Sequence, residues 1–137
     1  MNLVEKLLKV DPKKTEEKKK RDFSSERLGR MMGLEEPVQI TLQEIGAKRM
    51  SDLIAKQVNS KGNLDPSKVF DVKTLICVDG IINPDVKDEK LMEHFNCSTP
   101  KDLVIKLFGG EINAISDELI KLSDYKTVED TDDEVKN

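Results

Sequence analysis

The sequence predicts a mainly α protein: a small orthogonal helical domain of about five short helices with one short β segment near residues 38–43. Charged residues make up 36% of the 137 residues and aromatic residues only 4%, so the core must be small and mostly aliphatic. Apolar residues recur mainly at helical spacing, and only one segment alternates strictly between apolar and polar residues.

The first 33 residues are rich in lysine and arginine and are predicted to form a basic, partly flexible N-terminal arm. Leu3 and Leu7 lie on one face of a helix of about two turns, which is too short to hold in water unless it docks on something. Residues 13–21 lack apolar side chains, so we expect a solvated linker there.

A short helix is expected after Ser24 or Ser25, which can cap it, and it ends at Gly33. This helix carries the adjacent pair Met31 and Met32. Their flexible thioethers suit an adaptable apolar contact surface, and burial of both in the core is an equal alternative.

A helical domain is expected over residues 34–125, and its clearest β signal is the alternation at residues 38–43. One strand cannot pair its own backbone groups, so it needs a partner strand that the sequence does not identify. After Gly46 the period becomes helical, with Met50, Leu53 and Ile54 on one face.

Further helices are predicted by their start signals. Asp65-Pro66 combines a capping carboxylate with a proline at the first helical position, and a helix is favoured over a strand up to Asn83-Pro84. A short helix is expected at residues 88–95. Thr99-Pro100 is the best local signal, because the Thr99 hydroxyl can accept a hydrogen bond from the amide three residues on.

The last helix is expected from residue 111 to about residue 122, with a continuous apolar stripe that contains Ile112, Ile115 and Leu119. Residues 126–137 are acidic and almost without apolar side chains, so a disordered tail is expected there.

Groups for catalysis or metal binding are sparse. The one histidine, His94, is interpreted as a partly exposed structural residue, and Cys77 and Cys97 as buried reduced thiols. We therefore expect no enzyme, no metal and no cofactor. No apolar run approaches the roughly 20 residues that cross a bilayer, and no leader is recognised, so a cytoplasmic protein without a membrane partner is expected.

Several short motifs occur in a fixed order along the chain. They are Arg27-Leu28-Gly29, Val69-Phe70-Asp71-Val72-Lys73, Ile82-Asn83-Pro84-Asp85, Leu91-Met92, Ser98-Thr99-Pro100-Lys101-Asp102-Leu103, Gly110-Glu111-Ile112 and the segment from Leu119 to Tyr125. With the alternating segment at residues 38–42, their order and spacing resemble the XkdN-like tail assembly chaperones of tailed bacteriophages and prophages. The resemblance covers residues 27–125.

This resemblance implies a non-enzymatic role in tail morphogenesis. Proteins of the family bind the tape measure protein, a long and largely helical chain, and help tail tube subunits to polymerise around it. They are absent from the finished particle, and some are also made in a longer form by ribosomal frameshifting. The implied partners are the tape measure protein and the tail tube protein, and self-association is left open.

The partner-binding surface is expected wherever an apolar helical face stays open after the core forms. The candidate residues are Leu3, Leu7, Met31, Met32, Met50, Leu53, Ile54, Ile112, Ile115 and Leu119. Two other hypotheses stay open: a small nucleic-acid-binding regulator that uses the cations of residues 13–30, and a structural tail subunit. Acidic residues dilute those cations and no aromatic side chain interleaves them, which disfavours nucleic acid as a partner.

Overall fold

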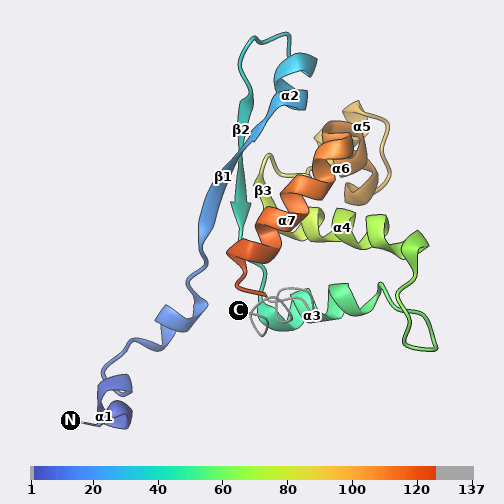
Figure 1. The fold of residues 1–137 in the computed structure, drawn as a ribbon. Coiled ribbons are helices and arrows are strands. Elements are labelled where there is room, and N and C mark those ends of the chain that lie inside the picture. The colour runs from blue at the N-terminus through green and yellow to red at the C-terminus, as the bar shows by residue number, and fades with distance from the viewer. Residues whose placement is uncertain (1, 126–137) are drawn as a thin grey trace, which may run out of the picture.

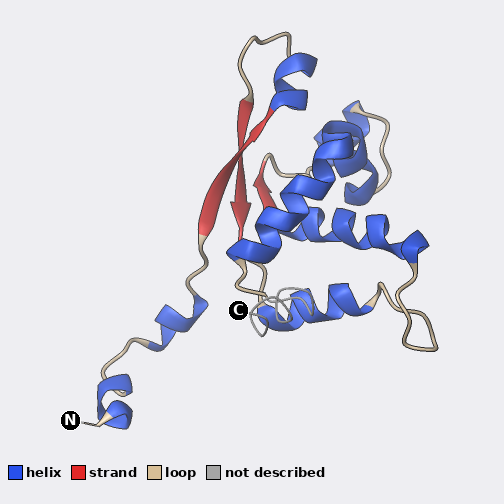
Figure 2. Cartoon of the chain, viewed as in Figure 1, coloured by secondary structure: helices blue, strands red, loops and turns tan. Residues whose placement is uncertain are grey.

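The computed structural model describes residues 2–125, in which a small antiparallel sheet lies beside a group of crossed helices (Figures 1 and 2). Strands β1 (Lys20–Ser25), β2 (Val38–Gln43) and β3 (Ile81–Asn83) are hydrogen-bonded in the order β1-β2-β3. The mainly α class is confirmed. The expectation of one short β segment is wrong, because residues 38–43 form the central strand of a three-stranded sheet.

Strand β1 is the partner that β2 requires. It pairs with β2 along its whole length, from Lys20 opposite Gln43 to Ser25 opposite Val38. The expected linker over residues 13–21 is therefore wrong at its end, since its last two residues belong to β1. The division into an N-terminal arm over residues 1–33 and a helical domain over residues 34–125 stays a prediction.

The helices begin and end close to where the sequence predicts them. Their bounds are α1 (Leu3–Leu7), α2 (Glu26–Met31), α3 (Ala47–Ala55), α4 (Pro66–Gly80), α5 (Glu89–His94), α6 (Pro100–Phe108) and α7 (Ile112–Leu122), with 3₁₀ turns η1 (Pro12–Glu16) and η2 (Gly109–Glu111). Helix α4 confirms the helical interpretation of its segment, and the chain changes to strand β3 only after Gly80.

Side-chain caps explain these helix starts. The Ser25 hydroxyl accepts a hydrogen bond from the Leu28 amide at 3.1 Å, and the Thr99 hydroxyl accepts one from the Asp102 amide at 3.1 Å. The Asp65 carboxylate accepts bonds from both the amide and the hydroxyl of Ser67, and these hydrogen bonds lower the pKa of Asp65. Each cap satisfies a first-turn amide that has no partner inside the helix.

The core lies where α4 and α7 cross and pack against α6 and the sheet. Gly80 makes that crossing close: a Cβ at this position would lie within 2.9 Å of the Leu119 Cγ and nearer still to both Leu119 methyl groups. Burial in this core raises the pKa of Cys77 to about 12. The expectation of a buried thiol holds for Cys77 and is wrong for Cys97, which is half-buried.

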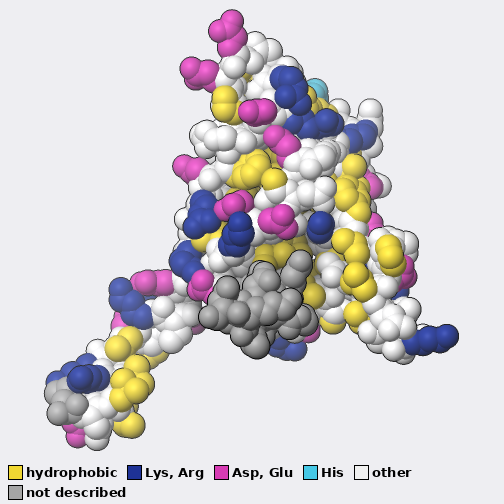
Figure 3. Space-filling model, viewed as in Figure 1, with side chains coloured by type: hydrophobic (Ala, Val, Ile, Leu, Met, Phe, Trp, Pro, Cys, Tyr) yellow, Lys and Arg dark blue, Asp and Glu magenta, His cyan; other side chains and the backbone are white. Residues whose placement is uncertain are grey.

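The N-terminal residues project from the sheet. Helix α1 and turn η1 contain no buried residue, and they lead away from the body at the end of β1 that is remote from α2 (Figure 1). Figure 3 shows apolar side chains along this projecting segment. The acidic tail predicted at residues 126–137 lies outside the described residues.

Candidate partner-binding site

Helix α2 is held in place by hydrogen bonds between residues 25–27 and residues 106–111, which lie about 80 positions further along the chain. The Arg27 guanidinium donates to the carbonyl oxygens of Leu107 at 3.2 Å and Lys106 at 3.1 Å, which are carbonyls of the last turn of α6. The Glu111 carboxylate accepts from the Ser25 hydroxyl at 2.6 Å and from the Glu26 amide at 3.1 Å. These bonds satisfy the free groups at the end of one helix and the start of another.

A second contact fixes α2 from its other side. Gly29 lies so close to the chain at residues 36–37 that a Cβ would approach within 3.2 Å of the Pro37 Cα and nearer still to the Glu36 carbonyl oxygen. A larger residue would push the helix outward. Because α2 is fixed on two sides, the positions at its C-terminal end, Met31 and Met32, are presented to solvent.

These two methionines border an apolar depression, which we call the α2–α5 groove. Its volume is about 420 Å³. Its lining residues are Leu28, Met31, Met32, Pro84, Leu91, His94, Phe95 and Leu107. The His94 and Phe95 rings meet edge to face, with centroids 4.9 Å apart, at one wall. A concave apolar surface with one polar ring and two flexible thioethers is suited to an apolar helix face.

The ten predicted contact residues divide sharply by exposure. Leu3 and Leu7 are 70% and 59% exposed, and Met31 and Met32 are 48% and 62% exposed. The candidates that the core covers completely are Met50, Leu53, Ile112, Ile115 and Leu119, while Ile54 is half-buried. The structure thus leaves open the N-terminal candidates, and it places the pair on α1 far from the pair on α2 (Figure 1).

Sequence reasoning missed part of the groove wall. Leu91 and Phe95 lie in the segment predicted as a short helix at residues 88–95, and neither was a candidate contact residue, but both are half-buried and line the groove. Their spacing of four residues on a helix with charged neighbours was the available signal. Pro84 belongs to one of the recognised motifs and lines the same groove.

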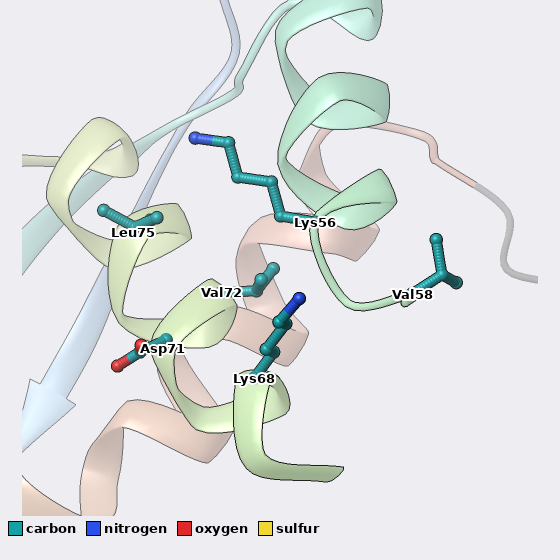
Figure 4. A pocket seen from close by; sticks show the side chains of 6 residues that line it. All are labelled: Lys56, Val58, Lys68, Asp71, Val72 and Leu75. Atoms are coloured by element: carbon teal, nitrogen blue, oxygen red, sulfur yellow. The ribbon is translucent and has the colours of Figure 1, made fainter. Parts of the chain in front are cut away.

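A second depression, of about 370 Å³, lies between the end of α3 and helix α4 (Figure 4). Val72 and Leu75 line it together with Val58 and the basic residues Lys56 and Lys68. Asp71 also borders it, but its carboxylate pairs with Lys101 at 2.8 Å. This depression is more polar than the α2–α5 groove and is a weaker candidate for an apolar helix.

Within residues 2–125, no three His, Cys, Asp or Glu side chains gather in a way that could hold a metal ion. In the same part of the chain, no helix has the length and apolar character needed to cross a membrane.

The fold and the groove define a small α-rich domain with an exposed apolar depression on its surface. The family model of the phage XkdN-like tail assembly chaperone proteins matches residues 4–136, and the chain belongs to this family. The chain is also similar to the crystal structure of the protein YqbN, with a TM-score of 0.53 and 18% sequence identity. The match covers 78% of this chain and 87% of that one, and it shows a shared fold. No curated protein sequence matches the chain.

Proposed function

We propose that this tail assembly chaperone binds the tape measure protein, and that a helical segment of that client lies in the α2–α5 groove. The observation that carries the proposal is the exposure of Met31 and Met32 on a helix that is fixed by Arg27, Glu111 and Gly29. Exposure of apolar side chains to water is unfavourable, and a patch of them on a fixed helix is typical of a binding surface.

The client's chemistry fits the groove. The family resemblance implies a long, largely helical partner, and an amphipathic helix presents apolar side chains three and four residues apart. Methionine side chains adapt to different residues, which suits successive segments of a long client. Contact with tail tube subunits belongs to the same proposal, through the same exposed apolar residues.

The proposal includes a non-enzymatic role in the host cytoplasm and departure before the particle is complete. It does not assign the basic segment to nucleic acid, because two of its cations form ion pairs with carboxylates in helix α7 and just after it. Lys19 pairs with Asp124 at 2.6 Å and Arg21 pairs with Glu118 at 2.8 Å. A structural subunit would stay in the tail, so mass spectrometry of purified particles checks the departure.

Co-expression with the tape measure protein tests the proposed client. We expect the wild-type chain to keep the client soluble and to co-purify with it, and we expect Met31→Glu combined with Met32→Glu to abolish both effects. The matched control is Leu64→Glu, because Leu64 is 60% exposed and lies outside the residues that line the groove. The proposal fails if the client is equally insoluble with and without the wild-type chain, or if the groove variant performs as well as the control.

A further inference from the structure

We propose that the α2–α5 groove also binds helix α1 of a second copy of this chain, so that two copies exchange their N-terminal arms. The inference uses the same groove as the proposed function. Its test needs no client, so the two can fail separately.

Helix α1 has an apolar face that the other described residues of its own copy leave exposed. Leu3, Val4, Leu7 and Leu8 are between 59% and 81% exposed, and each leucine has an apolar neighbour three or four residues away. A five-residue helix is too short to hold by itself in water. Its side chains therefore need an apolar partner, and the α2–α5 groove is more apolar than the depression beside α4.

The charges of the two segments are complementary. Residues 3–14 contain four lysines and two carboxylates, whereas residues 84–95, which supply one wall of the groove, contain four carboxylates and two lysines. A basic arm that approaches this wall is attracted before any apolar contact forms. The depression is within the size range of about 300–1,000 Å³ of sites that enclose small ligands, so it can accept side chains from one face of a short helix.

The direction of the arm favours a second copy over the arm's own groove. Strand β1 runs toward α2, and the arm precedes β1, so α1 leaves the sheet at the opposite end (Figure 1). To reach the groove of its own copy, the segment of residues 8–19 would have to reverse direction at Lys20 and run back along the whole of β1. The turn η1 lies within this segment and shortens the distance that it can span. An arm that meets a neighbouring molecule needs no reversal. Exchange between two copies is mutual, so the complex closes as a symmetric dimer.

Sedimentation velocity of the full chain over a wide range of concentration tests this inference. We expect a reversible monomer–dimer equilibrium that weakens as salt is raised. Leu3→Glu combined with Leu7→Glu is expected to raise the dissociation constant about tenfold or more. Both positions are exposed, so this arm variant keeps the folded body intact. Leu64→Glu is again the control and should associate like the wild-type chain.

A mixing experiment then distinguishes arm exchange from other contacts. The groove variant, Met31→Glu combined with Met32→Glu, keeps its own arm, and the arm variant keeps its own groove. Each alone should associate about tenfold or more weakly than the wild-type chain, and a mixture of the two should form a heterodimer through the one remaining arm–groove contact. The inference is overturned if the wild-type chain stays monomeric at every concentration, if either variant dimerises like the wild type, or if the mixture stays monomeric.

Discussion

Replacement of Glu111 by alanine should loosen helix α2 more than any ordinary surface substitution. The carboxylate accepts three hydrogen bonds: from the Ser25 hydroxyl at 2.6 Å, the Glu26 amide at 3.1 Å and the Arg27 amide at 3.4 Å. A hydrogen bond to a charged group contributes about 1.5–3 kcal/mol, and the loss of a helix N-cap costs about 0.5–2 kcal/mol. The bond from the Arg27 amide is long and adds little. The other two bonds both hold the start of α2, so their contributions do not simply add.

We therefore expect Glu111→Ala to lower the free energy of unfolding by about 2–4 kcal/mol. Part of that loss comes from Ser25, which is fully buried and whose hydroxyl would lose its acceptor. Glu111→Gln keeps the shape and one oxygen but loses the charge, so its loss should be about 1–2 kcal/mol. Urea unfolding followed by far-ultraviolet circular dichroism measures both values.

The matched control is Glu118→Ala, which removes the same type of side chain from helix α7. Its carboxylate pairs with Arg21 at 2.8 Å, but the two side chains are 33% and 50% exposed, so the expected loss is below about 1 kcal/mol. Hydrogen exchange adds a local readout, since only the Glu111 variants should speed the exchange of amides in α2. Equal losses for Glu111→Ala and Glu118→Ala would refute the idea that this carboxylate anchors α2.

Three further predictions follow from burial. Gly80→Ala should destabilise the protein by about 1–2 kcal/mol in urea unfolding, because the clash with Leu119 outweighs the gain in helix propensity of about 1 kcal/mol. In the native protein at neutral pH, a maleimide should label Cys97 and leave Cys77 unmodified, because burial raises the pKa of Cys77 to about 12 and shields it. Deletion of residues 1–17 should change the free energy of unfolding of the monomer by less than about 0.5 kcal/mol, because residues 2–17 bury no side chain.

Each of these predictions has a control within the chain. Gly110→Ala introduces a Cβ with no atom within 4 Å, so it should leave stability nearly unchanged, and an equal effect at both glycines would exclude the clash as the cause. Denatured protein should take up two labels, and two labels in the native protein would contradict the burial of Cys77. Deletion of residues 1–25 removes strand β1 and should prevent folding, so a stable product would show that the sheet is dispensable.

The helices could be predicted from the sequence because their start signals are local. The caps Ser25 and Thr99 act on amides three residues away, and this spacing can be recognised without knowledge of the fold. Strand β1 could not be predicted in this way. Its sequence is mostly charged and polar, only Phe23 and Ser25 are covered, and its pairing depends on β2, which lies a helix and a loop away.

The candidate site was predictable only in part, for a related reason. Amphipathic spacing identifies an apolar helix face but does not show whether another element covers it. The stripe that contains Ile115 and the exposed pair Met31 and Met32 are both apolar segments in the sequence. Packing of α7 across α4 covers the first, and the fixed position of α2 leaves the second open.

The motifs that carry the family resemblance serve mainly to build the fold. Arg27, Gly29 and Glu111 hold α2 against its neighbours, and Thr99 starts α6, so these residues report the architecture rather than the partner. Leu28, Pro84 and Leu91 belong to these motifs and also line the groove, whereas the exposed Met31 and Met32 lie outside them. Under the proposed function, substitutions at the exposed methionines would change the choice of partner while the junction that positions them stays the same, so specificity and stability would rest on different residues.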